Sequence, residues 1–247
     1  MNVAEPRAWR LLRTGAGEPC FNMALDEALL RGGGPPALRL YAWDPPALSL
    51  GHFQPREAFD AAAVRAAGAV IVRRPTGGGA IHHDRELTFS LSAEPGRDGY
   101  PADTLAAYRF VHGVLQEALA TVGATVTPFG GARLSTRPRD GTLCFLDHTA
   151  LDLVDAQGRK LVGSAQRRLA GRVLHHGSVP LQVPSLSPGG GSVALAAGRA
   201  VSWDELADAV VAAFARALPA PLRADRPTQA ELAEAARLAD RSASAND

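Results

Sequence analysis

The chain has 247 residues, of which 46% are hydrophobic and 21% are charged, and its formal net charge is +1. A chain of this length forms one large domain or two small ones, with a core that buries roughly 70–75% of the unfolded surface. The balanced charge gives no global attraction to nucleic acid or to a membrane, so we expect neither as a partner. No apolar run approaches the roughly 18 residues that span a bilayer, and the first residues lack a signal-peptide core, so we expect a cytoplasmic protein.

The first half of the chain predicts, in order, a helix over residues 22–30, strands over 38–43 and 47–50, a helix over 56–67, and strands over 69–73 and 87–91. Asn22 is a candidate cap of the first helix, and Asp44-Pro45-Pro46 is a turn signal.

The second half predicts a helix over 104–122 capped by Asp103, strands over 124–128, 151–154 and 160–162, short strands at 173–174 and 179–181, a loop over 184–192, and helices over 203–218 and 229–239. Ser202 is the candidate cap of the helix over 203–218, and residues 155–158 are a hairpin signal. We expect the small, polar tail over 240–247 to be disordered.

Clusters of strands with helices between them favour the α+β class, with a mixed, mainly antiparallel sheet flanked by helices. We expect residues 1–220 to form one catalytic domain, with residues 221–247 adding a C-terminal helix and the tail.

A glycine-rich segment follows the strand over residues 69–73. Gly77, Gly78 and Gly79 come directly after Arg73-Arg74-Pro75-Thr76. Glycines let a backbone approach a ligand closely, and successive free N–H groups form an anion or carbonyl cradle. A plain hairpin turn is the alternative. The segment is neither a Walker loop nor a dinucleotide fingerprint, since no Gly-Lys-Ser/Thr and no helix follow it.

Two histidine pairs, His82-His83 and His175-His176, could indicate a metal. Adjacent residues on a strand point to opposite faces, so neither pair chelates well by itself. We therefore expect no metal, and one histidine of each pair lining a pocket.

Lys160 is the only lysine among 26 basic residues, and Cys144 is one of two cysteines. Lysine differs from arginine in being a compact ammonium whose pKa moves on burial. The alternative is a lysine retained by chance in an arginine-rich chain. We expect Cys20 and Cys144 to be reduced thiols, with a disulfide between them as the alternative.

Several motifs together resemble the lipoate/octanoate branch of the biotin/lipoate protein ligase superfamily. They are residues 21–24, 48–51 with Gln54, 73–84, 86–90, 160–166 and 175–178, in the expected order over roughly residues 10–220. The resemblance implies an α+β domain whose glycine-rich loop and lysine strand line an acyl pocket. It also makes Lys160 the active-site lysine.

Two chemistries occur in that branch. Lipoate ligases activate a free acid with ATP and need no cysteine, whereas octanoyltransferases pass the acyl chain through a cysteine thioester. Thr142-Leu143-Cys144-Phe145 resembles the Cys-Phe of the ligase-like, cysteine-dependent octanoyltransferase class of lipoate assembly. This resemblance implies transfer of an octanoyl group from acyl carrier protein to a lysine of a lipoyl-domain protein, such as glycine cleavage H protein or an E2 subunit. The alternatives are an ATP-dependent lipoate ligase and a non-catalytic relative that binds the acyl group or its carrier.

The residues permit the transfer chemistry. A cysteine attacks as its thiolate, and an ammonium a few ångströms away favours that form. Lysine can also accept and return a proton. Backbone N–H groups near residues 78–79 or 163–164 could stabilise the oxyanion. No ATP or other cofactor is expected, because a thioester supplies the energy. Alternatively, Cys144 is a small buried hydrophobic residue, as we expect of Cys20.

The predicted site combines catalytic Cys144 and Lys160 with a set of substrate-binding residues. These are Arg74, Thr76, Gly77, Gly78, Gly79, Ala80, His83, Gly163, Ser164, Ala165, His176 and Gly177. We expect a monomer with two acidic protein partners, octanoyl-acyl carrier protein and the lipoyl-domain acceptor. A basic excess between residues 133 and 172 would attract both, although an ordinary solvated face is the alternative.

Overall fold

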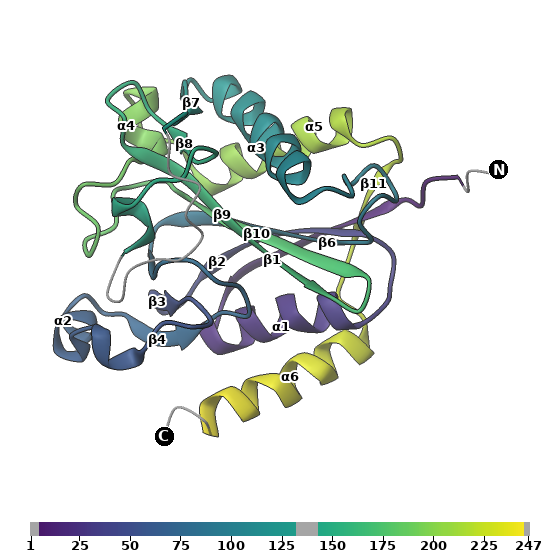
Figure 1. Cartoon of the computed structure of the whole chain (residues 1–247), viewed down its shortest axis with the longest axis horizontal. Coiled ribbons are helices and arrows are strands. Elements are labelled where there is room, and N and C mark those ends of the chain that lie inside the picture. Colours follow the sequence, from purple (N-terminus) through teal and green to yellow (C-terminus); the bar gives the residue numbers. More distant parts are fainter. Residues whose placement is uncertain (1–4, 132–142, 245–247) are drawn as a thin grey trace.

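The structure is a computed structural model that describes residues 5–131 and 143–244 (Figure 1). The helices are α1 (Pro19–Arg31), α2 (Ala61–Ala66), α3 (Thr104–Thr121), α4 (Val193–Ala197), α5 (Trp203–Ala217) and α6 (Gln229–Ser244), with 3₁₀ turns η1 (Arg56–Ala58) and η2 (Cys144–Leu146). The strands are β1 (Trp9–Gly17), β2 (Ala37–Trp43), β3 (Ala47–Leu50), β4 (Val70–Arg73), β5 (Ile81–His83), β6 (Glu86–Ala93), β7 (Thr127–Pro128), β8 (Leu153–Val154), β9 (Lys160–Leu169), β10 (Arg172–Pro180) and β11 (Leu222–Asp225). Within these described ranges, no helix has both the length and the apolar character that crossing a membrane requires.

The strands form two sheets. The larger has the order β11-β1-β2-β6-β10-β9-β8-β7, and the smaller has the order β4-β3-β5. In the larger sheet β1 pairs in parallel with β2 and β11, while the pairs from β2 through β6, β10 and β9 to β8 are antiparallel. The mixed, mainly antiparallel sheet confirms the predicted fold class.

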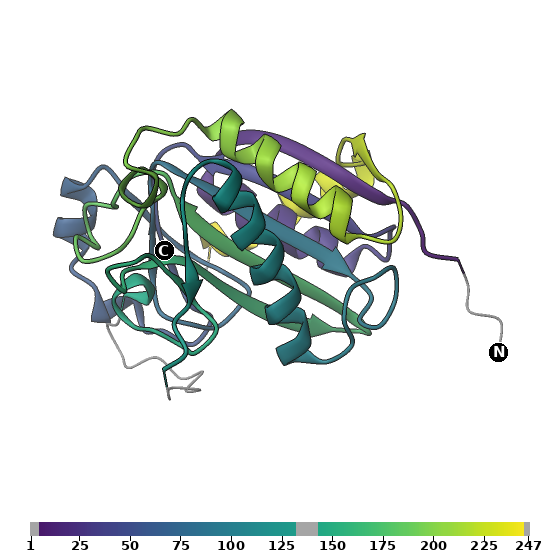
Figure 2. The same cartoon turned by 90° about the horizontal axis from the view of Figure 1, so that it is seen from above.

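Helices cover both faces of the large sheet (Figures 1 and 2). Helices α3 and α5 pack side by side on one face, and α1 lies against the other, with α6 packed on its outer side. Asp103 and Ser202 cap α3 and α5 through their side-chain oxygens, as predicted. Glu18, rather than Asn22, caps α1, because the helix begins at Pro19, three residues before the predicted start, and so contains Asn22.

The strand β6 explains how the sheet positions a site. All its residues are buried, and they alternate between apolar and polar. Leu87, Phe89 and Leu91 join the core beneath α3 and α5. Thr88 and Ser90 alternate with them and therefore face α1. The face of the sheet beneath α1 is consequently a buried polar layer, whose groups must be hydrogen-bonded within the protein.

The small sheet holds the glycine-rich segment. This segment links β4 to β5, which both pair with β3. Gly51 follows β3 and lies so close to the loop that a Cβ atom there would stand 2.0 Å from the Gly78 carbonyl oxygen. Gly78 has a φ of +99°, a conformation that glycine adopts without strain.

Several predicted elements need correction. The helix over 56–67 is a 3₁₀ turn and a short helix, because Asp60 caps a new helix at Ala61. Residues 173–174 and 179–180 belong to one strand, β10, whose central residues are buried although polar, and the strand ends before Leu181. The strand over 124–128 is reduced to β7, and residues 240–244 of the predicted disordered tail continue α6. Strands β1 and β11 and helix α4 had no predicted counterpart.

The C-terminal segment packs on the rest of the chain. Strand β11 pairs with β1, and Arg10 of β1 forms ion pairs of 2.6 Å with both Asp225 and Glu231. Ala235 and Leu238 of α6 share a core with α1. The domain boundary at residue 220 stays a prediction.

Candidate active site

Cys144 and Lys160 come together at one end of the large sheet. Cys144 begins the 3₁₀ turn η2, and its backbone N–H donates to the Ala80 carbonyl at 2.7 Å. Lys160 is the first residue of β9 and is 2% exposed. Its Nζ lies 3.2 Å from Cys144 Sγ and donates to the Asp147 carbonyl at 3.2 Å. The predicted juxtaposition of thiol and amine is present, and neither Cys144 nor Cys20 is in a disulfide.

A carboxylate that the sequence analysis did not select completes the contacts of Lys160. Asp152, which is 3% exposed, places Oδ2 2.7 Å from Lys160 Nζ. Burial alone would lower the pKa of Lys160, but the Cys144 thiolate and the Asp152 carboxylate together raise it above its ordinary value. The lysine is therefore an ammonium that lies between the Asp152 carboxylate and the Cys144 sulfur.

Glycine at position 163 leaves room for this arrangement. A Cβ atom on Gly163 would lie 2.6 Å from Lys160 Cε and 3.6 Å from Cys144 Sγ. Gly191 similarly abuts the Lys160 carbonyl, to which its N–H donates at 2.7 Å. The absence of a side chain at Gly163 thus leaves space for the Lys160 side chain beside the thiol, while Gly191 lets the chain approach the Lys160 backbone.

Arg74 organises the glycine-rich loop from within. Its guanidinium donates to the carbonyls of Gly77, Gly79 and Ser49 at 2.7–3.2 Å. Burial lowers the pKa of Arg74 to about 10, and the nearby Cys144 charge opposes that shift. The glycine-rich loop is therefore a turn whose conformation is fixed by the buried Arg74 side chain. The same turn forms part of the pocket wall.

A pocket opens beside Cys144 and enters the polar face of the sheet beneath α1. The space within it is about 410 Å³ including its mouth. It is lined by Met23, Tyr41, Trp43, Ser49, Arg74, Gly77, Gly78, Ile81, His83, Thr88, Cys144, Ser164, Ala165, His176, Gly177 and Ser178.

The pairing register shows how the pocket crosses the sheet. Gly163 pairs with Ser178, Ser178 with Thr88, and Thr88 with Tyr41. Neighbouring strands lie about 4.8 Å apart, so this row extends about 14 Å from the backbone of Gly163 to that of Tyr41. Small side chains along the row leave space for a narrow chain, and Tyr41, with neighbouring Trp43, closes the far end.

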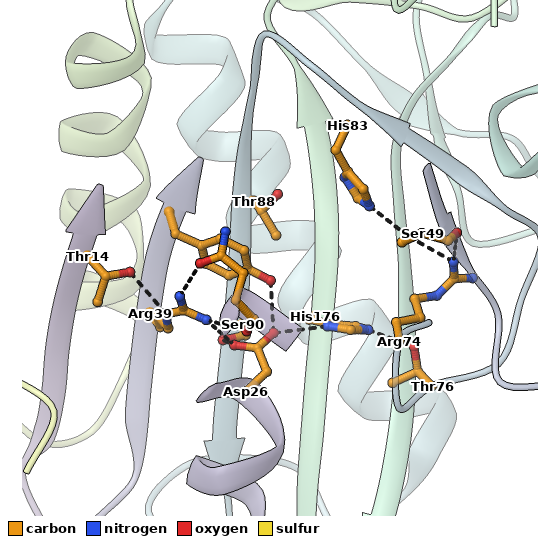
Figure 3. A network of polar contacts seen from close by, with 12 residues as sticks. Thr14, Asp26, Arg39, Ser49, Arg74, Thr76, His83, Thr88, Ser90 and His176 are labelled. Atoms are coloured by element: carbon orange, nitrogen blue, oxygen red, sulfur yellow. Dashed lines mark hydrogen bonds and ion pairs between the residues drawn. The ribbon is translucent and has the colours of Figure 1, made fainter. Parts of the chain in front are cut away.

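Two carboxylate–histidine–hydroxyl networks support the pocket, and Figure 3 shows the first of them with His83 and Ser49 of the second. In the first, His176 lies between Asp26 and Thr76, with Nδ1 3.1 Å from Asp26 Oδ2 and Nε2 2.6 Å from Thr76 Oγ1. Arg39 also binds Asp26 at 2.8 Å. Burial opposes ionisation of Asp26, but Arg39 and His176 lower its pKa overall. This network connects α1, β10 and the glycine-rich loop.

The second network joins the two sheets. His83 Nδ1 lies 2.7 Å from Glu86 Oε1, and His83 Nε2 lies 2.7 Å from Ser49 Oγ. Trp43 stacks on the His83 ring with a centroid distance of 4.0 Å. Because an ionised carboxylate only accepts hydrogen bonds, His83 donates to Glu86 from Nδ1.

The structure brings most predicted site residues to the pocket wall. Arg74, Gly77, Gly78, His83, Ser164, Ala165, His176 and Gly177 all line it, as does Cys144. The other predicted residues lie behind the wall: Thr76 binds His176, Gly79 accepts from Arg74, Ala80 binds Cys144, and Gly163 contacts Lys160. One histidine of each pair lines the pocket, as predicted. The binding roles themselves stay predictions.

Several residues of the site were missed by the sequence analysis. They are Asp26, Tyr41, Trp43, Ser49, Asp152 and Ser178. Buried serine at alternate strand positions was a signal for Ser178. No local signal singled out Asp152.

The predicted basic segment is partly paired or buried where it is described, while Arg167 and Arg168 donate to the backbone carbonyls of Pro75 and Ala102. Arg133, Arg137 and Arg139 lie outside the described residues. Arg159 pairs with Asp155 at 2.7 Å, and Arg172 is 7% exposed. No cluster of three or more possible metal ligands occurs within residues 5–131 and 143–244.

Comparison with known proteins places this site in a family. The family model described as the lipoyl protein ligase A/B catalytic domain matches residues 18–187. The chain belongs to this family. Octanoyltransferase LipM of Symbiobacterium thermophilum is 40% identical over 94% of this chain and 94% of its own length. Octanoyltransferase LipM of Kyrpidia tusciae is 41% identical over 72% of this chain and 67% of its own length.

Solved structures agree on the fold. A lipoate-protein ligase A bound with ATP superposes with a TM-score of 0.77 at 26% identity, covering 95% of both chains. A bipartite lipoate protein ligase from Thermoplasma acidophilum, described with its E2 lipoyl domain, gives a TM-score of 0.74 at 24% identity over 96% of this chain and 92% of its own. The second likeness supports the fold alone.

Proposed function

We propose that the protein is an octanoyltransferase of lipoate biosynthesis, which moves an octanoyl group from acyl carrier protein to a lysine of a lipoyl-domain protein. Glycine cleavage H protein and E2 subunits are acceptors of this kind. The observation that carries the proposal is the 3.2 Å contact between Cys144 Sγ and Lys160 Nζ beside a narrow pocket. The relatives named octanoyltransferase LipM support the same activity.

In the first half-reaction Cys144 attacks the carbonyl carbon of the octanoyl thioester. A bond forms between that carbon and Sγ, the bond to the carrier sulfur breaks, and the proton displaced from Cys144 leaves on the carrier thiol. Lys160, held as an ammonium, stabilises negative charge on Sγ during attack. The octanoyl chain then occupies the row from Gly163 toward Tyr41.

In the second half-reaction the amine of the acceptor lysine attacks the same carbonyl carbon. A C–N bond forms, the bond to Cys144 breaks, and an amine proton goes to the departing sulfur. Conversion of a thioester to an amide is downhill, so the cycle needs no ATP. The N–H groups near Gly78 and Gly163 are candidates for oxyanion stabilisation.

The test is incubation with octanoyl-acyl carrier protein in the absence of ATP, followed by intact mass measurement. We expect one octanoyl group, released by hydroxylamine, that is lost in Cys144→Ala and retained in Cys20→Ala. The Cys20 variant is the matched control, since Cys20 lies on α1, outside the residues lining the pocket.

A second candidate function is ATP-dependent lipoate ligation, which the likeness to the ATP-bound ligase favours. It predicts modification of a lipoyl domain from free acid and ATP, and this activity would survive Cys144→Ala. Absence of both reactions would leave a non-catalytic relative that binds the acyl group or its carrier.

A further inference from the structure

The amine of Lys160 lies next to the atom that the proposed acyl-enzyme would carry. In that intermediate the octanoyl carbonyl carbon is bonded to Cys144 Sγ, and Lys160 Nζ is 3.2 Å from the same sulfur. The inference that follows therefore rests on the proposed function.

This proximity makes an inactivating side reaction possible. The transfer ends when a lysine amine attacks the Cys144 thioester, and an uncharged Lys160 could make the same attack. The Lys160 Nζ–carbonyl C–N bond would form, the C–S bond to Cys144 would break, and the amine proton would pass to the sulfur. The product would be an amide that inactivates the enzyme.

The effective molarity of neighbouring groups and the uncharged fraction of lysine show that an unprotected Lys160 would react with the thioester. Well-oriented neighbouring groups react with effective molarities of about 10⁵–10⁸ M. Even an ordinary lysine is uncharged in about one molecule in 2,500 at pH 7. Burial increases this fraction, because it disfavours the charged form. Lys160 is 2% exposed, so a counter-charge is needed to hold its proton.

We propose that Asp152 protects Lys160 from octanoylation by keeping its amine protonated beside the acyl-enzyme. Asp152 Oδ2 is 2.7 Å from Nζ, closer than the sulfur. A thioester sulfur carries no negative charge, so in the acyl-enzyme Asp152 is the anion that offsets the burial of Lys160. Asp152 is a positioning residue in this proposal, since it acts through Lys160.

Among the described residues, two titratable side chains of α3 and one backbone carbonyl also act on Lys160. Tyr108 and His112 approach it from α3, where burial raises the pKa of Tyr108 to about 12 and lowers the pKa of His112. The Asp147 carbonyl accepts a hydrogen bond from Nζ. None of these groups can replace the charge of Asp152.

Hydrogen bonds fix both the backbone and the carboxylate of Asp152. Its Oδ2 accepts from the Thr149 N–H at 2.7 Å, and its own N–H donates to the Thr149 carbonyl at 3.1 Å. The Phe129 N–H donates to the Asp152 carbonyl at 2.9 Å. The preceding carbonyl, that of Leu151, accepts from His112 Nδ1 at 2.5 Å. The carboxylate therefore has little freedom to leave Lys160.

His112 is the last side chain in a series of hydrogen bonds whose donors and acceptors can all be assigned. A carbonyl only accepts, so His112 donates from Nδ1 and, being neutral, accepts the Ser164 hydroxyl at Nε2 over 2.7 Å. The Ser164 oxygen must then accept from His175 Nε2 at 2.9 Å. This leaves His175 Nδ1 to accept from the Tyr100 hydroxyl at 3.0 Å. The chain connects the core beneath α3 to the segment that holds Asp152.

The test uses Asp152→Asn with octanoyl-acyl carrier protein and intact mass measurement before and after hydroxylamine. We expect the wild type to carry only a hydroxylamine-sensitive group. The variant should accumulate an octanoyl group that resists hydroxylamine, and peptide mapping should assign this group to Lys160. Its transfer activity should fall in proportion to this modification. Asp155→Asn is the matched control, because Asp155 is a buried carboxylate of the same hairpin that pairs with Arg159 instead. A variant that forms and discharges only the Cys144 thioester would overturn the proposal.

A second measurement does not depend on acyl transfer and is made on variants shown to be folded by circular dichroism. Lys160 is the only lysine, so labelling lysine with ¹³C gives one side-chain Cε signal to titrate by NMR. We expect its pKa to lie above the ordinary value in the wild type and to fall in Asp152→Asn but not in Asp155→Asn. A wild-type Lys160 that is uncharged at neutral pH, or no fall in the Asp152 variant, would contradict the proposal. If instead the wild type is never acylated, the proposed function fails and this titration still reports the Asp152 contact.

Discussion

Gly163 occupies the position on β9 at which a side chain would collide with the reacting pair. In Gly163→Ala the new Cβ would lie 2.6 Å from Lys160 Cε, so the amine must move. A displacement of about 1 Å costs about 100-fold in rate, and we expect a loss of that order in the rate of octanoyl-Cys144 formation, followed by rapid-quench mass measurement.

The matched control for this variant is Gly113→Ala. Gly113 lies within α3, where a Cβ meets nothing within 4 Å. We expect unchanged acylation there and a gain of about 1 kcal/mol in stability from helix propensity. Equal acylation rates in the two variants would contradict the role given to Gly163.

Lys160→Arg tests whether charge alone suffices. Arginine keeps the charge, but its planar guanidinium is larger than an ammonium and the site around Lys160 is closed by Gly163 and Gly191. We expect acylation of Cys144 to fall about 100-fold or more, measured as single-turnover kinetics with octanoyl-acyl carrier protein. Activity close to wild type would show that only the positive charge matters.

The sequence analysis found Cys144 and Lys160 because both lie in recognisable motifs. It did not find Asp152, because the contact with Lys160 depends on the pairing of β8 with β9. That pairing shifts register between Leu153 and Val154. A shift of one residue changes which side chains meet, and nothing in the local residue pattern specifies it.

At the scale of elements, α6 holds α1 against the sheet. Arg10 joins β1 to α6 through Glu231, with side chains 9% and 11% exposed. Removing one partner of such a pair leaves a poorly solvated charge, so we expect Arg10→Met to lower the free energy of unfolding by about 3 kcal/mol. Urea denaturation measures this change.

The control for Arg10→Met is Arg199→Ala, which removes a solvent-exposed ion pair with Glu205. Exposed pairs contribute little, so we expect its urea midpoint to match the wild type. If the two variants were equally stable, the ion pairs of Arg10 would not be what fastens the C-terminal segment.

The strongly patterned elements were predicted and the irregular ones were not. Helix α3 has a clear apolar stripe and a cap at Asp103, and its predicted bounds were within one residue. Strand β10 was predicted only as two fragments, because His175, His176 and Ser178 interrupt its apolar pattern although all three are buried. Edge strand β11 is mostly exposed and carries no alternation. Buried polar residues of a site therefore interrupt the apolar pattern from which their strand would be predicted.

At the scale of the whole molecule, the buried histidines make stability depend on pH. Burial lowers the pKa of His82, His112, His175 and His176. As pH falls below about 6.5, the unfolded chain binds protons that the folded chain does not, so stability is lost on acidification. Asp26 and Glu86, whose pKa values are lowered in the folded state, extend the loss to lower pH.

We therefore expect the urea midpoint to fall continuously from pH 7.5 to pH 5. Far-ultraviolet circular dichroism across a series of buffers of equal ionic strength would follow it. A midpoint that stays constant over this interval would mean that the four histidines titrate normally in the folded protein.

The burial of Lys160 has a practical consequence for work with partner proteins. The chain has no other lysine, so its exterior offers no lysine side chain to amine-directed cross-linkers or succinimidyl dyes. Such reagents will label the lysines of a carrier or lipoyl domain mixed with this protein, but they will find no exposed lysine on this chain. Mapping the complex will therefore require carboxyl-directed or photoactivated chemistry.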